Sequence, residues 1–315
     1  VEYSTDGLSL AITYMDATQG WIPTTDDDVT DAPSKGNSEG IFGYGTTASV
    51  TAVTNLVSNA GVVASDVTGV GTARRYPAGC EYGNDKAIFG FGHDGSNRVS
   101  MTNLVSNAGV VATDVTGVGT GRQSLAGCEY GGDKAIFGFG GTTGYLSMTN
   151  LVSNAGVVAT DVTGVGTARE GLAACEYGAD TAIFGFGGSY NITNLISNTG
   201  VVASDQAAET GTARYGLAAC GYGYDKGIFG FGEGYTDVTN LVSNAGVVAT
   251  DTTGVGTARG YLAACEYGYD KGIFGYGNTG SYAALTNLVS NAGVVASDTT
   301  GVGTARKGPA ACSFN

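Results

Sequence analysis

Short runs of apolar residues, separated by turn-forming residues, recur along the chain. Within residues 169–214 these runs are Leu172–Tyr177, Ala182–Phe186, Asn191–Ser197 and Gly200–Ser204. Each run is apolar, β-branched or alternating in polarity, and glycine or asparagine separates it from the next. No segment places apolar residues at helical spacing over about ten positions. The pattern therefore predicts four short strands per unit, which we call a, b, c and d, and no helix.

The same unit occurs six times with little change. The strand b segment Ile-Phe-Gly-Phe/Tyr-Gly begins at Ile41, Ile88, Ile136, Ile183, Ile228 and Ile273. The strand c segment Thr-Asn-Leu-Val/Ile-Ser-Asn begins at Thr54, Thr102, Thr149, Thr193, Thr239 and Thr286. A repeat of about 45–48 residues is typical of propeller blades, and four strands predict one antiparallel blade per repeat. Alternate glycines in strand b leave one face bare, so that a neighbouring backbone or ring can approach it.

The two ends of the repeat region complement each other. The first repeat starts at strand b, Gly40–Gly45, with no strand a before it, and the sequence ends on a lone strand a, Gly308–Asn315. Pairing these two segments would leave no open sheet edge. We therefore expect an all-β fold over residues 40–315, a six-bladed β-propeller of four-stranded antiparallel blades that the C-terminal strand closes.

Residues 1–39 have a different character. Leu8–Met15 is apolar enough for a strand or the end of a preceding module. Asp16–Pro33 is polar, rich in turn residues and contains the only tryptophan. We expect a linker here, or the end of a preceding module.

The repeats resemble Kelch-type blades. An arginine, an apolar inner strand and an apolar-aromatic segment ending in glycine follow one another in each, and Gly140-Gly141 and Gly187-Gly188 resemble the Kelch diglycine. The other repeats lack this pair, and none has the later tryptophan of the family. The resemblance covers residues 40–315 and implies a Kelch-like β-propeller.

A second resemblance concerns the setting of the protein. The polar linker, followed by repeated KAIFGFG and TNLVSNAGVVATD blocks, resembles tail-fibre and other virion structural proteins of marine bacteriophages. This resemblance implies an extracellular, virion-associated adhesion module. Its partners would be a host cell-surface glycan or protein and other virion proteins.

Composition narrows the classes of partner. The chain has 28 acidic and 14 basic residues, a formal net charge of −14. Nucleic-acid phosphates and anionic membranes attract basic surfaces, so we expect neither as a partner. No apolar stretch approaches the ~20 residues that span a bilayer, so we expect no membrane insertion. Hydrophobic residues reach 42%, enough for a core.

The candidate chemistry is sparse. One cysteine recurs at the same place on strand a, at Cys80, Cys128, Cys175, Cys220, Cys265 and Cys312. Repeat symmetry would hold these positions apart, so we expect buried free thiols. His93 is the only histidine, so neither a Ser–His–acid set nor the histidine-rich copper site of Kelch-like oxidases can be built. We predict no metal, no cofactor and no enzymatic activity.

Two further sets of charged residues recur. Aspartates follow strand d at Asp66, Asp114, Asp161, Asp205, Asp251 and Asp298. Arginines come eight or nine residues later, at Arg74, Arg122, Arg169, Arg214, Arg259 and Arg306. Pairing of aspartate with arginine would hold each d–a connection. Glutamates end strand a at Glu81, Glu129, Glu176 and Glu266, which leaves open a cation in a central channel.

The repeats differ most in their b–c and d–a connections, which emerge on the same face of an antiparallel blade. These connections are rich in tyrosine, glycine, serine and asparagine, a composition typical of adaptable recognition. The candidate binding residues are Arg75, Tyr76, His93, Arg98, Tyr145, Tyr190, Tyr215, Tyr235, Tyr261 and Tyr282. Neutral drift of exposed loops would produce the same divergence. A purely structural virion knob and a polysaccharide-acting enzyme are the alternative functions.

Overall fold

Strands are the only regular elements among the residues that the computed structural model describes, which are 12–16, 20–23, 37–206 and 211–315. No helix long and apolar enough to cross a membrane occurs in this part of the chain. The chain divides into two units, Val1–Lys35 and Gly36–Asn315. In the first unit, β1 (Ile12–Asp16) pairs antiparallel with β2 (Gly20–Pro23). β2 lies within Asp16–Pro33, the polar segment for which the sequence predicts a linker or the end of a preceding module.

The second unit consists of six three-stranded antiparallel sheets, one per repeat. The first strands of sheets 1 to 6 are β20 (Ala310–Phe314), β5 (Ala78–Tyr82), β8 (Ala126–Tyr130), β11 (Ala173–Tyr177), β14 (Ala218–Tyr222) and β17 (Ala263–Tyr267). The second strands are β3 (Glu39–Gly43), β6 (Lys86–Gly90), β9 (Lys134–Gly138), β12 (Thr181–Gly185), β15 (Lys226–Gly232) and β18 (Lys271–Gly275). The third strands are β4 (Thr54–Val57), β7 (Thr102–Val105), β10 (Thr149–Val152), β13 (Thr193–Ile196), β16 (Thr236–Val242) and β19 (Thr286–Val289). This repeated all-β arrangement is consistent with a propeller-like fold.

The prediction of four regular strands per repeat is wrong for the segment called d. Val63 forms only one isolated bridge to Val57, and Val67 forms another to Thr54. Between these bridges the Ala64 amide donates to the Leu56 carbonyl at 2.8 Å, and Nδ2 of the buried Asn55 donates to the Ala64 carbonyl. The outer segment therefore stays hydrogen-bonded to the third strand without forming a regular strand.

Neighbouring sheets interlock through the glycine and the aromatic residue of the second strands. A Cβ added at Gly185 of β12 would lie 2.5 Å from the Phe229 ring of β15, in the next sheet. The corresponding pairs are Gly43–Phe89, Gly90–Phe137, Gly138–Phe184, Gly230–Phe274 and Gly275–Phe42. The last pair joins the sixth repeat to the first. The bare strand face expected from the sequence is thus filled by a ring of the next sheet.

The second glycine of the Phe-Gly-Phe/Tyr-Gly segment has a different role. The aromatic residue before it has a positive φ in every repeat, for example 62° at Phe186, and Gly187 follows at 94°. This backbone ends the second strand, except in sheet 5, where β15 continues to Gly232. The alternation of glycines predicted one continuous strand face, whereas the chain turns after the first glycine.

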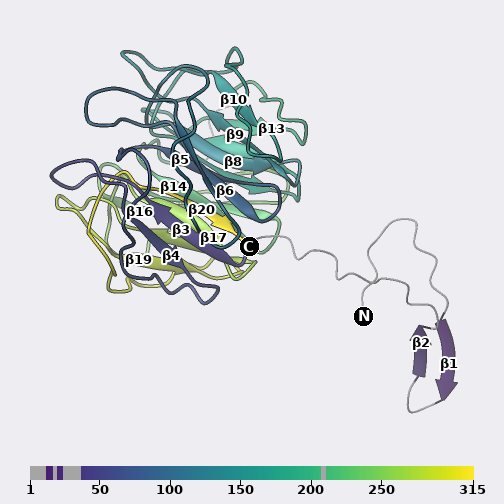
Figure 1. The fold of residues 1–315 in the computed structure, drawn as a ribbon. Coiled ribbons are helices and arrows are strands. Elements are labelled where there is room, and N and C mark those ends of the chain that lie inside the picture. Colours follow the sequence, from purple (N-terminus) through teal and green to yellow (C-terminus); the bar gives the residue numbers. More distant parts are fainter. Residues whose placement is uncertain (1–11, 17–19, 24–36, 207–210) are drawn as a thin grey trace. The chain divides into compact units, whose positions relative to one another are not determined.

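The last strand pairs with the first, as the complementary ends of the repeat region predict. In β20, Ala310–Phe314 pairs antiparallel with Gly43–Glu39 of β3 (Figure 1). Ile41, Phe42, Cys312 and Phe314 are all buried at this junction. Beyond the last paired residues of these two strands, the Ser38 amide donates a hydrogen bond to the Asn315 carbonyl at 2.8 Å.

Candidate functional site

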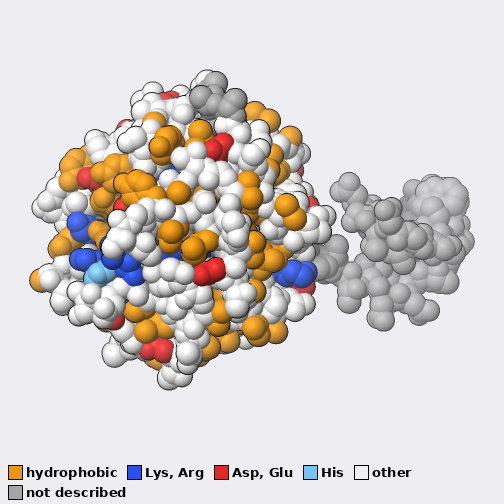
Figure 2. Space-filling model, turned by 90° about the horizontal axis from the view of Figure 1, so that it is seen from above, with side chains coloured by type: hydrophobic (Ala, Val, Ile, Leu, Met, Phe, Trp, Pro, Cys, Tyr) orange, Lys and Arg blue, Asp and Glu red, His pale blue; other side chains and the backbone are white. Residues whose placement is uncertain are grey.

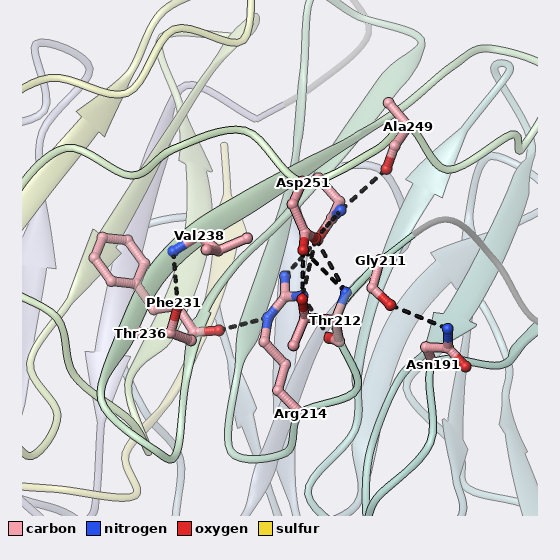
Figure 3. Close-up of polar contacts among 10 residues, drawn as sticks. Asn191, Gly211, Thr212, Arg214, Phe231, Thr236, Val238, Ala249 and Asp251 are labelled. Atoms are coloured by element: carbon pink, nitrogen blue, oxygen red, sulfur yellow. Dashed lines mark hydrogen bonds and ion pairs between the residues drawn. The ribbon is translucent and has the colours of Figure 1, made fainter.

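A buried arginine anchors the connection that enters each sheet. Arg214 donates from Nε to the Phe231 carbonyl at 2.8 Å, from Nη1 to the Thr212 carbonyl at 3.1 Å and from Nη2 to Asn240 Oδ1 at 2.7 Å (Figure 3). Its guanidinium lies 4.4 Å from the Phe186 ring centroid, in the preceding sheet. The five other arginines lie over the equivalent rings in the same way. The side chain therefore links two sheets and holds the connection between them.

An aspartate completes this network. Asp251 accepts hydrogen bonds from the Thr212 amide and hydroxyl and from Asn240 Nδ2, and its Oδ1 lies 4.0 Å from Arg214 Nη1 (Figure 3). The partner of Arg214 is thus the aspartate of the following repeat, and not Asp205, which precedes it in sequence. Asp205 instead pairs with Arg169. The predicted Asp/Arg pairing is confirmed, with a different choice of partners.

The network shifts the pKa values of both charged groups. Burial lowers the pKa of Arg214 to about 10, against the attraction of Asp251. Partial burial favours a higher pKa for Asp251, but the hydrogen bonds from Thr212 and Asn240 and the charge of Arg214 outweigh it. The pKa of Asp251 therefore lies below its ordinary value. Both groups are charged at neutral pH.

The residue two positions after each arginine belongs to a closed ring of backbone hydrogen bonds. Each amide in the ring donates to the carbonyl of the preceding member, at 2.7–3.0 Å. All members have a positive φ of 52–67°. The members, in chain order, are Tyr76, Ser124, Gly171, Gly216, Tyr261 and Gly308. The first and last members are themselves bonded, from the Tyr76 amide to the Gly308 carbonyl at 2.8 Å.

Three tyrosines gather over this ring. Tyr261 lies between Tyr76, at a centroid distance of 5.4 Å, and Tyr215, at 6.1 Å. The glycines make room for them, because a Cβ at Gly308 would lie 2.4 Å from the Tyr76 ring and one at Gly216 3.1 Å from the Tyr261 ring. Burial, the neighbouring tyrosines and Glu233 raise the pKa of Tyr261, so its hydroxyl is protonated at neutral pH. The three rings form one aromatic surface.

The b–c connections lie beside the d–a connections, as the antiparallel sheets require. Arg75 forms a backbone bridge to His93, and His93 forms one to Arg98. Gln123, Gly141 and Tyr145 repeat this arrangement in the next sheet, and Gly260, Asn278 and Tyr282 repeat it in sheet 6. In sheets 4 and 5 the equivalent contacts are hydrogen bonds from the Gly188 amide to the Glu170 carbonyl and from the Glu233 amide to the Tyr215 carbonyl.

The candidate tyrosines therefore divide into two groups. Tyr76 and Tyr261 are half-buried in the central cluster, and Tyr215 is its exposed member. The other candidates are exposed in the b–c connections, and no ring contact joins them to this cluster in the described part of the chain. They are Tyr145, Tyr190, Tyr235 and Tyr282.

The sequence predicted two of the six ring members, Tyr76 and Tyr261, as binding residues. It did not identify the other four, Ser124, Gly171, Gly216 and Gly308, or the neighbouring Lys307. The available signal was the frequent glycine at the second position after the arginine, since glycine readily adopts a positive φ. Tyr76 and Tyr261 adopt it at the same position, so residue type alone did not identify the ring.

The a–b turns at the other end of the strands are joined in a similar way. The Gly83 amide donates to the Asp133 carbonyl, and the Gly223 amide donates to the Asp270 carbonyl, both at 2.8 Å. Four lysines in these turns pair with the preceding aspartate, at Nζ–Oδ1 distances of 2.5–2.7 Å. Tyr224 and Tyr269 are exposed at this end.

Small residues and carboxylates of the first strands line a central cavity of about 30 Å³. Glu81 Oε1 accepts a hydrogen bond from the Ser313 amide at 2.6 Å, and burial raises the pKa of Glu81. A Cβ at Gly221 would lie 1.8 Å from Glu266 Oε1, so the missing side chain leaves room for that carboxylate. Among the described residues, no group of three or more His, Cys, Asp or Glu side chains is placed to hold a metal ion.

The six cysteines face the spaces between sheets. All are buried and unpaired, which confirms the predicted free thiols. Burial raises the pKa of each thiol. A Cβ at Gly227 would lie 2.4 Å from Cys175 Sγ, so the sulfur packs closely against the next sheet.

The chain was compared with protein-family models and with curated proteins. No family model matches the chain, and no curated protein matches it significantly.

Proposed function

We propose that the six sheets form a closed, six-bladed β-propeller of the Kelch-like type. The pairing of β20 with β3 supports this proposal. The glycine–aromatic contacts and the backbone ring, both of which join the last repeat to the first, support it as well. The outer segment of each repeat would then be an irregular fourth strand of its blade.

On this scaffold, we propose a non-enzymatic, tail-fibre-like adhesion module that is extracellular and virion-associated. The proposal rests on the location of the residues that differ among the repeats. Their strands and buried network are nearly identical, whereas the residues that vary meet at one end around Tyr76, Tyr215 and Tyr261. Tyrosine offers a flat apolar ring together with a hydroxyl, which suits a sugar or a peptide. The ligand would be a host cell-surface glycan or protein.

The alternatives differ in what they require of this end. A structural virion knob would need no ligand there and would bind only other virion proteins. A polysaccharide-acting enzyme would need acids with access to a sugar. The carboxylates of the first strands lie beside a cavity of about 30 Å³, close to the volume of one water in the liquid. This size favours a binding module over an enzyme acting in the channel.

A glycan array with paired tyrosine variants tests the proposal. Tyr76→Ala combined with Tyr215→Ala should weaken binding about tenfold or more, because stacking and hydrogen-bonding surface is lost. Tyr224→Ala combined with Tyr269→Ala, at the opposite end, is the matched control and should bind like the parent. Melting temperatures of both double variants show whether the fold is preserved.

Each other outcome favours a different function. Loss of binding only in the control pair would place recognition at the a–b turns. Binding to no glycan and to no host-surface protein would favour the structural knob. Release of shortened products from a polysaccharide would favour the enzyme.

A further inference from the structure

Most lysine and arginine side chains of this protein are buried or paired with an aspartate. Of its 14 lysines and arginines, six arginines are buried in the inter-sheet networks. Four lysines pair with the adjacent aspartate in the a–b turns, and Lys35 lies outside the described residues. The three that remain are Arg75, Arg98 and Lys307. None of them has a carboxylate within 4.0 Å in the described part of the chain.

These three cations lie at one end, together with the only histidine. The Arg75 and His93 backbones exchange hydrogen bonds at 3.0 and 2.9 Å, and His93 forms a bridge to Arg98. Figure 2 shows basic side chains gathered around the histidine. Burial, Arg75 and Arg98 lower the pKa of His93, so the imidazole is neutral at pH 7 and can donate or accept a hydrogen bond.

The basic residues border the aromatic cluster. The Arg75 guanidinium lies 5.8 Å from the Tyr76 ring centroid, and Lys307 Nζ lies 5.6 Å from that of Tyr261. Tyr76 and Tyr261 lie side by side between these two cations. Arg75 Nε, moreover, is buried without a hydrogen-bond partner among the described residues. Two flat rings are thus flanked by two cations on a surface of the protein.

Three acidic residues lie near this surface. Asp94 accepts hydrogen bonds from the Ser96 and Asn97 amides. Burial raises the pKa of Tyr76, and the charges of Glu233 and Glu170 add to this shift. Burial also raises the pKa of Glu170, and the charge of Arg98 opposes that shift. The net charge of −14 belongs to the whole chain, and charges beyond about 8 Å are largely screened at physiological salt. Arg75 and Lys307 have no carboxylate within 4.0 Å in the described part of the chain, so both remain open to an anionic group although the protein as a whole is acidic.

We propose that Arg75, His93, Arg98 and Lys307, together with Tyr76 and Tyr261, form a binding surface for an acidic glycan. A pyranose ring would stack on the tyrosines, while its carboxylate or sulfate groups would accept hydrogen bonds from the flanking cations. A second, shallow cavity of about 70 Å³ is lined by Tyr76 and Tyr261, so the ligand would rest on the tyrosine rings, as the flat face of a pyranose does. An acidic peptide is the alternative that the test below separates. The inference rests on the proposed adhesion function and names its class of ligand.

Surface plasmon resonance with matched probes tests this inference. The probes are an oligogalacturonate, its neutral methyl ester, dextran sulfate, neutral dextran and poly-glutamate. The parent chain should bind at least one acidic glycan about tenfold or more tightly than its neutral counterpart. Arg75→Gln combined with Arg98→Gln should remove about tenfold or more of this affinity, since each lost charge-assisted contact is a large contribution. Lys307→Gln should weaken binding in the same direction.

Lys134→Gln combined with Lys226→Gln is the control, because it removes the same charge from the opposite end. It should leave the affinity within about twofold, since distant charges are screened. Equal weakening by this control would overturn the inference, as would equally tight binding of poly-glutamate. Binding of neutral glycans that depends on Tyr76 and Tyr215 would overturn the acidic ligand and leave the adhesion proposal standing. Binding of no glycan at all would overturn this inference, and the adhesion proposal would fall with it only if no host-surface protein bound either.

Discussion

At the scale of single residues, the six buried arginines keep their charge because almost every polar group of the network has a partner. Arg169 shows the full set, with contacts to the Phe186 carbonyl, the Thr167 carbonyl and Asn194 Oδ1. Arg74 departs from it, because its Nε has no partner among the described residues. Breaking a buried charge pair is costly, since it leaves a charge uncompensated. The stability of the fold therefore depends on whether the aspartates of the network are ionised.

Acid should destabilise the fold through these aspartates. Partial burial favours a higher pKa for Asp114, but hydrogen bonds from Thr72 and Asn103 and the charge of Arg74 outweigh it and lower its pKa. The same holds for Asp66, Asp161, Asp205, Asp251 and Asp298. A lowered pKa stabilises the folded state above the unfolded pKa of about 3.9, and this contribution is lost as the pH falls through the folded value.

Urea unfolding at pH 6, 4 and 2.5 measures this effect. The free energy of unfolding should fall steeply below about pH 4. Glu81, whose pKa is raised by burial, acts in the opposite direction but is outnumbered. Asp251→Asn should lower stability at pH 6 and flatten the acid dependence. A free energy that stays constant down to pH 2.5 would contradict the role given to the aspartates.

At the scale of elements, the second strand of each sheet packs closely against the next sheet because one of its residues is a glycine without a side chain. Gly185 leaves the space that the Phe229 ring occupies, and Phe229 in turn packs edge-on against Phe186 at 5.2 Å. Both rings are fully buried. A strand interior usually loses stability with glycine. Here the close approach of the next sheet compensates for that loss.

Gly185→Ala should therefore destabilise the protein, although alanine normally favours a strand over glycine. The new Cβ would lie 2.5 Å from Phe229 Cζ, and overpacking of this kind costs about 1–3 kcal/mol. The matched control is Gly144→Ala in the exposed b–c connection of sheet 3, where a Cβ meets nothing within 4 Å. Denaturant unfolding should show a change within about 0.5 kcal/mol for the control. Equal stability of the two variants would mean that the sheets can separate at no cost.

At the scale of the whole molecule, the two ends of the second unit meet where every other sheet has an a–b turn. In sheet 2 three residues lie between the paired Tyr82 and Lys86. In sheet 1 the paired residues are Phe314 and Glu39, and Asn315, Asn37 and Ser38 occupy the turn. Asn315 has a φ of 75°, close to the 65° of Gly83. The junction of Asn315 with Asn37 and Ser38, which we call the seam, therefore has the geometry of an a–b turn although no covalent bond joins the two ends.

Removal of residues 308–315 should therefore prevent stable folding. The deletion takes away β20 and exposes Ile41 and Phe42. The loss of several buried side chains, at about 2–5 kcal/mol each, exceeds the usual net stability of about 5–15 kcal/mol. Solubility and thermal melting of the truncated chain measure this, and a chain that lacks residues 1–35 is the control. Melting of the truncated chain at the parent temperature would show that β20 is dispensable.

A circular permutant tests whether the two ends can be joined by a covalent bond without loss of stability. Joining Asn315 directly to Asn37 and opening the chain between Gly144 and Tyr145 should give a protein that melts close to the parent. The new bond falls in a turn of the right length, and the new ends fall in an exposed loop, where permutation is best tolerated. The permutant lacks residues 1–36, so the control is the unpermuted chain 37–315. If that chain folds and the permutant does not, the junction of Asn315 with Asn37 is not equivalent to a turn.

The sequence alone is enough to predict the repeat, the first three strands of each unit and the connections that vary. The recurrence of Ile88-Phe89-Gly90 and its equivalents identified the second strands, and the unmatched segment at Gly308 identified the partner of the first. Local patterns carry this information because a strand's alternation and its turn residues depend on near neighbours. They located the tyrosines without showing which of them cluster.

The contacts between repeats could be found only in the folded chain. There Arg214 pairs with Asp251 and not with Asp205, and Tyr76 is bonded to Gly308 in one backbone ring. The Asn55 side chain helps to hold a fourth segment that forms no regular strand. Six nearly identical repeats offer six nearly identical partners for each side chain, so the sequence alone cannot distinguish among them. The choice depends on which sheet lies beside which, and that is settled by packing between sheets.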